Sequence, residues 1–214
     1  MNTPDAKCGV LAITATVTVF TAASAAESGA VDALITNLKS KDDKVRGPAW
    51  QGAGKEGAPA VKPLVALMSD ADFETARSAK RALLKIVRHA GRPGAAKEGK
   101  AVEKELIALL RDGPVPVRRE VLWMLSEIGG DDAITAVAAL LKDPELREDA
   151  RCVLLRIPGK KSTAALQKAF AVAPEEFKFA LADALRERGE KVAGYPTRRA
   201  TPVKQTTIAP KLKA

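Results

Sequence analysis

Apolar residues recur at helical spacing in the middle of the chain. The stretch from Val115 to Gly130 has apolar side chains at i, i+4, i+8 and i+11, namely Val117, Val121, Leu125 and Ile128. At about 100° of rotation per residue, this spacing places the four side chains along one stripe of a helix. The pattern therefore predicts an amphipathic helix with one buried face.

The same stripe recurs four more times, which indicates a repeated unit. With Val117 as the reference, the equivalent positions are Val45, Thr75, Leu146 and Phe177. Successive reference positions are 30, 42, 29 and 31 residues apart. Each of these helices follows another apolar helix after a short turn, and the preceding helices are expected at residues 31–38, 61–68, 102–110, 134–141 and 164–171. Helix pairs at this pitch predict an all-α solenoid of about five two-helix repeats.

The repeats share a signature of aspartate in the turn between the helices, an apolar residue and arginine, a small apolar residue, leucine, and finally isoleucine and glycine. The clearest copy consists of Asp112, Val117, Arg118, Val121, Leu125, Ile128 and Gly129. Partial copies consist of Asp43, Val45, Arg46 and Ala49, and of Asp143, Leu146, Arg147, Ala150, Leu154 and Ile157. This signature resembles that of HEAT repeats, and the short pitch is similar to that of the HEAT-like repeats of phycobilin lyases.

The resemblance covers residues 30–189 and implies a right-handed α-α superhelix of the HEAT or armadillo type. It also implies that Arg46, Arg118 and Arg147 link neighbouring repeats. The fifth repeat departs from the signature, because Arg188 stands where isoleucine is expected. A lyase activity does not follow from the resemblance, because many unrelated binding proteins share this repeat and a fold does not determine a function.

The N-terminal segment has the pattern of a secretory signal. Residues 10–26 carry no charge, follow Lys7 and end in small residues, which suits cleavage just before Ala26 or Glu27. We therefore expect a signal peptide over residues 1–26 and export of the protein to the periplasm or out of the cell. The alternative is an uncleaved membrane anchor, since the apolar run is close to the ~18 residues that can span a bilayer.

Positive charge is concentrated at the C-terminal end. The 35 lysine and arginine residues and the 26 aspartate and glutamate residues give a net charge of +9, and residues 189–214 contribute +5 of it. Residues 190–214 contain three prolines and no apolar periodicity, so we expect a disordered basic tail after a repeat domain over residues 27–189. Such a tail attracts polyanions, for example anionic lipids or acidic envelope polymers, without selecting one. Export disfavours nucleic acid as the partner.

The sequence offers few groups for catalysis or metal binding. Signal cleavage removes Cys8 and leaves Cys152, which either packs as a small side chain or pairs with a partner protein. Because His89 is the single histidine, neither a histidine pair nor a CxxC zinc site can form in the mature chain. GxSxG and GxxxxGKS/T motifs are absent from the sequence. We expect no catalytic residues, no metal site and no cofactor.

A glycine-rich insertion separates the second repeat from the third. Residues 89–100 contain three glycines and account for the longest spacing, 42 residues. Long loops between otherwise tight turns often carry binding functions. The insertion is therefore either a binding loop or a tolerated surface addition.

The non-core face of the second helices supplies the candidate binding site. Positions two and six residues after each reference position lie about 200° and 240° around the helix, opposite the buried stripe. In the middle of the chain these positions hold Arg77, Arg81, Arg119 and Trp123. Because tryptophan and arginine often carry interface energy, we predict that the four residues form a partner-binding patch on the concave face. The alternative is that Trp123 fills space between repeats and the arginines are solvated.

These observations favour an exported HEAT-repeat scaffold or adaptor that binds another protein and has no catalytic activity. Two other functions stay open. The first is binding of an anionic polymer or a membrane surface through the basic concave face and the tail. The second is lyase-like action on a bilin-type chromophore, for which Arg81 and Cys152 are the candidate contacts. The sequence predicts neither the identity of the partner nor the oligomeric state.

Overall fold

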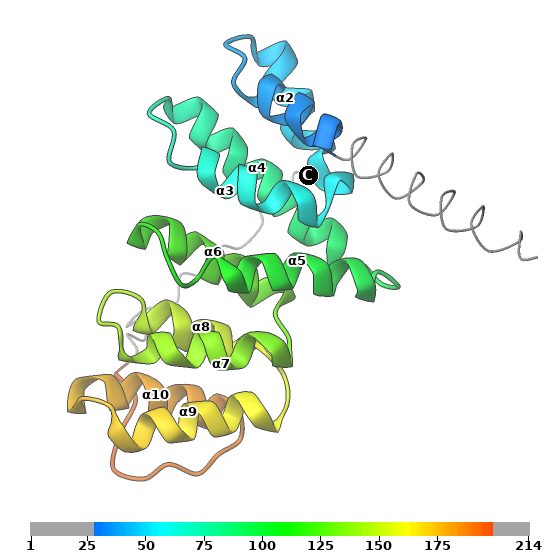
Figure 1. Ribbon diagram of the computed structural model, residues 1–214. Coiled ribbons are helices and arrows are strands. Elements are labelled where there is room, and N and C mark those ends of the chain that lie inside the picture. The colour runs from blue at the N-terminus through cyan, green and yellow to red at the C-terminus, as the bar shows by residue number, and fades with distance from the viewer. Residues whose placement is uncertain (1–27, 199–214) are drawn as a thin grey trace, which may run out of the picture.

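The computed structural model describes residues 28–198 of the 214-residue chain, and within that range it contains helices and no strands. The helices form five pairs that stack along the chain (Figure 1), which confirms the predicted all-α solenoid. The first helices of the pairs are residues 28–38, α3 (Val61–Leu67), α5 (Ala96–Ala108), α7 (Ile134–Ala139) and α9 (Lys160–Val172). The second helices are α2 (Asp43–Gly52), α4 (Phe73–Ala90), α6 (Val115–Ile128), α8 (Arg147–Arg156) and α10 (Glu175–Glu187).

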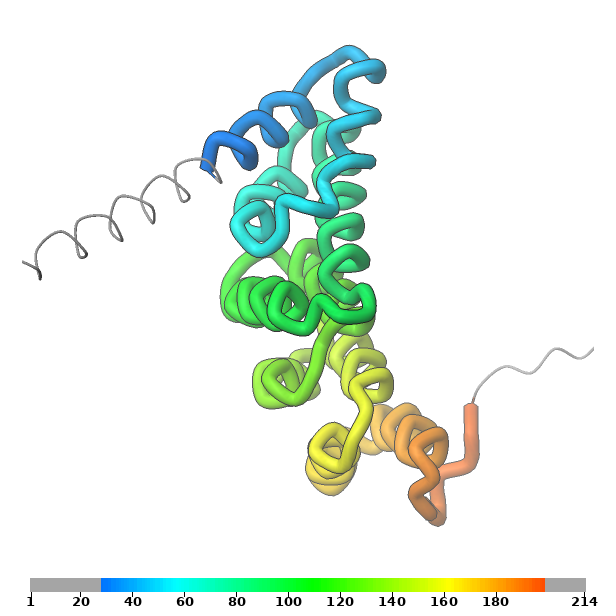
Figure 2. The backbone as a smooth tube through the Cα atoms, turned by 90° about the vertical axis from the view of Figure 1, so that its right-hand side faces the viewer, coloured from blue at the N-terminus to red at the C-terminus, as the bar shows by residue number. Residues whose placement is uncertain are grey.

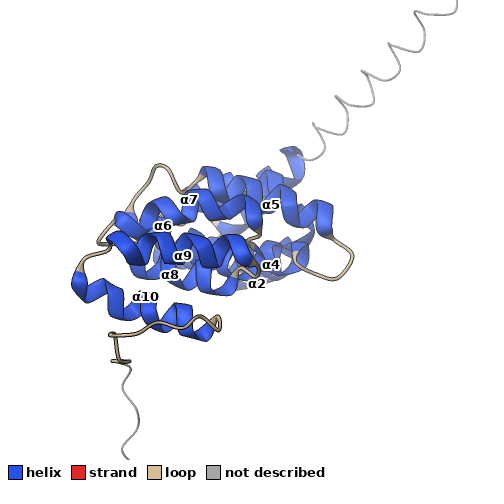
Figure 3. Ribbon diagram, turned by 90° about the horizontal axis from the view of Figure 1, so that it is seen from below, coloured by secondary structure: helices blue, strands red, loops and turns tan. Residues whose placement is uncertain are grey.

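The stack has two layers, because each chain segment turns back on itself between helices. Figure 2 shows the first helices along one side of the stack and the second helices along the other. Figure 3 shows the chain that follows α10 lying alongside that helix. We call the outer surface of α2, α4, α6, α8 and α10 the second-helix face.

The predicted apolar stripes form the core between the layers in repeats two to five. Thr75, Leu146 and Phe177 are buried at the reference positions, and Val117 is half-buried. The core is made almost wholly of aliphatic side chains, and leucines such as Leu122 are fully enclosed. Burial of one leucine of this kind stabilises the fold by about 1.5–3 kcal/mol, so the stripes account for the stacking of the repeats.

The prediction for the first repeat was wrong by one residue. Val45, expected in the core, is 40% exposed, and Arg46 is 8% exposed in its place. The guanidinium of Arg46 donates to the carbonyl oxygen of Ser40 at 2.8 Å and to the carboxylate of Asp43. These contacts satisfy the buried charge, and the helix is rotated so that the arginine faces inward.

The insertion between the second and third repeats is mostly helical. Helix α4 runs on to Ala90 and α5 begins at Ala96, so a connection of residues 91–95 remains. Arg92 closes this connection, because Nη1 and Nη2 each lie 2.8 Å from the carboxylate of Glu98. The extra residues therefore lengthen two helices and leave a short turn in place of the expected long loop.

Arginines link neighbouring repeats, as the HEAT resemblance implies. Arg118 Nε donates to the carbonyl oxygen of Leu110 at 2.9 Å, and its Nη1 lies 3.7 Å from Asp143 Oδ2 in the next repeat. The guanidinium of Arg147 lies over the ring of Phe177 in the repeat that follows, 4.9 Å from the centroid. The contacts with Asp143 and Phe177 each cross from one repeat to the next.

The predicted signal peptide and most of the predicted tail lie outside the described residues. Within residues 28–198, no helix has the length and apolar character needed to cross a membrane. Residues 190–198, the first part of the predicted tail, follow α10 without regular secondary structure, and Tyr195 contacts α9 and α10.

Candidate functional site on the second-helix face

The four predicted patch residues lie on two neighbouring second helices. Helix α4 begins at an N-cap, where the carboxylate of Asp72 accepts a hydrogen bond from the Thr75 amide at 2.9 Å, and it carries Arg77 and Arg81. Helix α6 carries Arg119 and Trp123. The buried stripes of the two helices turn the four side chains toward the second-helix face.

Trp123 presents a large aromatic surface at the middle of this face. Its neighbours Leu122 and Met124 are fully buried, whereas Trp123 is 38% exposed. Lys80 Nζ lies 5.7 Å from the centroid of the Trp123 ring and 2.5 Å from Glu120 Oε1. The indole is therefore held against a paired lysine on α4, and a substantial part of it remains accessible to a partner.

Arg119 links α6 to α8. Its Nε lies 3.0 Å from Asp149 Oδ2, and its Nη2 donates to the carbonyl oxygen of Glu145 at 2.7 Å. A similar link joins α4 to α6, where Arg88 Nε lies 3.2 Å from Glu127 Oε2. These ion pairs join α6, which carries Trp123, to the second helices on either side of it.

Arg77 and Arg81 make their contacts with residues other than Trp123. The guanidinium of Arg81 lies over the ring of Trp50 in the first repeat, 5.1 Å from the centroid. Arg77 pairs with Glu74 of its own helix at 2.9 Å. Lys80, which contacts Trp123, was not among the predicted residues, because it lies between the two positions of α4 that the helical spacing placed opposite the buried stripe.

Charge changes sign along the second-helix face. Helix α4 has five lysine or arginine residues and one glutamate, whereas α10 has four acidic residues and two basic ones. Neighbouring second helices are joined by the ion pairs Lys80–Glu120, Arg88–Glu127 and Arg119–Asp149.

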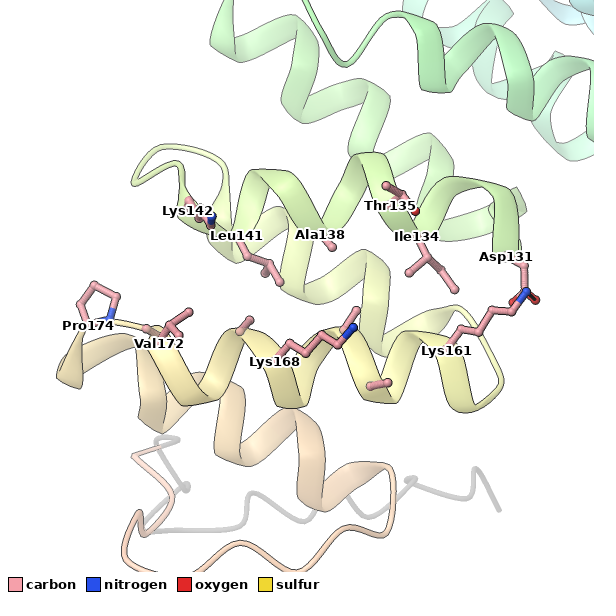
Figure 4. A pocket seen from close by; sticks show the side chains of 14 residues that line it. Asp131, Ile134, Thr135, Ala138, Leu141, Lys142, Lys161, Lys168, Val172 and Pro174 are labelled. Atoms are coloured by element: carbon pink, nitrogen blue, oxygen red, sulfur yellow. Dashed lines mark ion pairs between the residues drawn. The ribbon is translucent and has the colours of Figure 1, made fainter.

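A second candidate surface, on the opposite layer, is a groove between α7 and α9. It has a volume of about 1050 Å³. Figure 4 shows Ile134, Leu141 and Val172 directed into the space between the two helices. The groove exists because many of its lining residues are alanines, whose side chains are too small to fill the space; they are Ala138, Ala164, Ala165, Ala169 and Ala173.

Lysines form much of the rim of this groove. Lys142, Lys161 and Lys168 all line it, and Lys161 Nζ lies 2.8 Å from Asp131 Oδ2. The hydrogen bond and the charge of Asp131 raise the pKa of Lys161 above its ordinary value. The groove was not predicted from the sequence, because the candidate site was sought on the second helices. The alanines of α9 are the sequence feature that indicates it.

Groups suited to metal binding or nucleophilic chemistry are sparse in the described part of the chain. Between residues 28 and 198, no three histidine, cysteine, aspartate or glutamate side chains are arranged to hold a metal ion. Cys152 is exposed on α8, which contradicts the alternative that it packs in the core. Its Sγ lies 3.4 Å from Nη2 of Arg151.

No protein-family model matches the chain, and no curated protein matches it. Its fold is similar to that of solved structures of designed repeat proteins. A computationally designed armadillo repeat protein for modular peptide recognition is 21% identical, with 72% of this chain and 80% of that one covered and a TM-score of 0.42. A designed armadillo repeat protein in complex with the peptide (KR)4 is 20% identical, with coverage of 72% and 80% and a TM-score of 0.43. An engineered protein is 24% identical, with coverage of 76% and 80% and a TM-score of 0.39.

Proposed function

We propose that this protein is a scaffold that holds another protein against its second-helix face, with Trp123 as the central contact. The observation that carries the proposal is the 38% exposure of Trp123 between residues that are fully buried. Truncation of a tryptophan at the centre of an interface often costs more than 2 kcal/mol of binding free energy. A solenoid is suited to this role because its stacked helices present an extended and rigid surface.

The paired charges around Trp123 favour a protein partner over a polyanion. Lys80 and Arg119 are both engaged by carboxylates, those of Glu120 and Asp149. An anionic polymer would have to compete with these carboxylates. A protein surface, in contrast, can cover the indole and leave the ion pairs at the edge of the interface, where they contribute to specificity.

We further propose that residues 1–26 act as an export signal, so that the partner is met in the periplasm or outside the cell. The basic residues after position 198 would add salt-sensitive attraction to anionic surfaces. The scaffold is proposed to have no catalytic activity of its own. Lyase-like action is not supported by the position of Arg81, because its guanidinium lies over Trp50.

Affinity capture from an extract of the native host tests this proposal. The full chain is compared with Trp123→Ala and with Phe73→Ala, an exposed aromatic at the start of α4 that serves as a matched control. A third variant lacks residues 199–214. We expect the same partner to be captured by the wild type, the control and the truncated chain, and to be lost with Trp123→Ala. Capture that requires residues 199–214 and disappears in high salt would instead show that the tail binds a polyanion.

A further inference from the structure

The segment that follows α10 lies against that helix in the manner of a bound peptide. Arg186 Nη2 donates to the carbonyl oxygen of Val192 at 3.3 Å and to that of Tyr195. The ring of Tyr195 packs edge-on against Phe170 and Phe179, with centroids 5.2 and 5.3 Å apart. The backbone of this segment is therefore held by hydrogen bonds from the Arg186 side chain to main-chain carbonyl oxygens. The ring of Tyr195 adds an aromatic contact with α9 and α10.

Arg198 ends the described part of this segment against Phe179 and forms part of the wall of an acidic pocket between α8 and α10. Its guanidinium carbon lies 3.3 Å from the centroid of the Phe179 ring. Glu148, Glu176 and Asp183 line the same pocket, which has a volume of about 340 Å³. An aromatic face combined with carboxylates is the arrangement that recognises a guanidinium group.

A buried arginine in the wall of this pocket is incompletely satisfied. Arg151 is 9% exposed, and its Nε and Nη2 lie 3.0 and 2.7 Å from the carboxylate of Glu148. Its Nη1 is buried and has no hydrogen-bond partner among residues 28–198. Buried N–H groups are nearly always paired, so Arg151 has a donor that residues 28–198 leave without an acceptor.

We propose that the pocket formed by Glu148, Arg151, Phe179 and Asp183 binds an arginine side chain of an extended peptide from the partner protein, and that Arg198 covers the Phe179 ring until the partner displaces it. The proposal rests on the proposed function, since α8 and α10 belong to the second-helix face, and it names the chemistry of the partner.

Fluorescence anisotropy with a labelled peptide tests the pocket. The peptide has the sequence of residues 192–203 and is titrated with the full chain and with its Arg198→Ala variant, in which no guanidinium covers the Phe179 ring. We expect the variant to bind more tightly than the wild type, because its own arginine no longer competes. Adding Phe179→Ala to the variant should weaken binding by about tenfold, which is the size expected for a loss of cation–π and apolar contact.

Two controls separate recognition from general charge attraction or misfolding. A peptide in which Arg198 is replaced by alanine needs no change in the protein, and it should bind about tenfold more weakly than the parent peptide. Adding Phe73→Ala, remote from the pocket on α4, to the Arg198→Ala chain should leave peptide binding unchanged. If the wild type and the Arg198→Ala chain bind both peptides equally, and Phe179→Ala has no effect, the pocket is only a cap on the last repeat and the proposal is overturned.

The result is independent of the test of the proposed function. Peptide binding that depends on Phe179, combined with partner capture that does not depend on Trp123, would support the pocket and contradict the Trp123 interface. Partner capture that depends on Trp123, combined with peptide binding indifferent to Phe179, would support the scaffold and overturn the pocket.

Discussion

The guanidinium of Arg188 donates a hydrogen bond to the carbonyl oxygen of Ile157, with Nη1 and that oxygen 2.9 Å apart. The same nitrogen lies 2.9 Å from the carbonyl oxygen of Leu155, and Nη2 lies 2.6 Å from that of Gly159. Carbonyl groups at the end of a helix have no partner within that helix. Arg188 therefore satisfies the end of α8 from the last repeat.

Replacing Arg188 should weaken the packing of the last repeat against α8. For Arg188→Ala we expect the free energy of unfolding to fall by about 2–3 kcal/mol, because several partly buried carbonyls lose a charged donor. Urea denaturation followed by circular dichroism measures the change. Arg156→Ala is the matched control, since Arg156 is exposed and donates to Ser126 alone in the described structure; its cost should stay below about 1 kcal/mol. Equal costs for the two variants would contradict the role assigned to Arg188.

This position also shows what the sequence could predict. The buried stripe of α4, with Ala79 and Leu83, followed from spacing alone, because burial in a stacked helix depends on rotation about its own axis. The pattern expected isoleucine at position 188 and gave no indication that the side chain would reach α8. Contacts of that kind depend on the relative placement of two helices, which periodicity does not determine.

For the candidate site, too, the exposure of single side chains could be predicted from the sequence, and the contacts between helices could not. Exposure of Trp123 on the second-helix face followed from its position opposite the stripe. Its neighbour Lys80 did not, because a shift of one residue decides which side chain of α4 faces α6. The groove between α7 and α9 depends on the volumes of side chains from two repeats, and the binding of residues 190–198 depends on aromatic contacts over a long range. The proline-containing basic tail carries no local signal in its sequence that residues 190–198 contact α9 and α10.

Gly129 follows α6 at a position where a side chain would meet the last turn of that helix and the side chain of Ile157. A Cβ atom at this position would lie 2.5 Å from the carbonyl oxygen of Leu125 and 3.4 Å from Cδ1 of Ile157. For Gly129→Ala we therefore expect a loss of about 1–3 kcal/mol in the free energy of unfolding. At Gly52, the last residue of α2, an added Cβ atom would meet open space outside its own helix, so Gly52→Ala should stabilise the fold by about 0.5–1 kcal/mol. Thermal melting of both variants checks the opposite signs, and a loss at both positions would contradict this account.

The ionisation of Asp72, which pairs with Lys41 of the first repeat, makes the stability of the fold depend on pH. Its carboxylate accepts hydrogen bonds from Lys41 at 2.5 Å and from the Thr75 amide at 2.9 Å, and these bonds hold the pKa of Asp72 well below its ordinary value. Because the folded pKa is lower than the unfolded value of about 3.9, the stabilisation is complete above that pH and is lost as the pH falls below it. The difference in unfolding free energy between the wild type and Asp72→Asn should therefore be larger at pH 6 than at pH 2.5.

The contribution of Lys41 to this effect can be isolated. In a Lys41→Met background the ammonium group is absent. The loss of unfolding free energy caused by Asp72→Asn should then differ less between pH 6 and pH 2.5 than it does in the wild-type background. Chemical denaturation of the four chains at both pH values gives the comparison. An unchanged difference in the Lys41→Met background would show that the pair with Lys41 does not lower the pKa of Asp72.

The groove between α7 and α9 predicts where the chain tolerates added volume. Ala138 lines the groove, so Ala138→Leu should place its side chain in open space and change the free energy of unfolding by less than about 1 kcal/mol. Ala150 is fully buried in α8, and Ala150→Leu should cost about 1–3 kcal/mol through overpacking. Equal destabilisation by both substitutions, measured by urea unfolding, would mean that the groove is filled in solution.

The central claim is that partners bind at Trp123 on the second-helix face, and site-specific photo-crosslinking in the native host tests it most directly. A benzophenone amino acid is placed at position 123 in one chain and at position 172 in another, since Val172 is 75% exposed on the opposite layer beside the groove. Crosslinked products are identified by mass spectrometry. We predict one partner protein crosslinked from position 123 and absent from position 172. A partner crosslinked only from position 172 would contradict the account and place binding at the groove between α7 and α9.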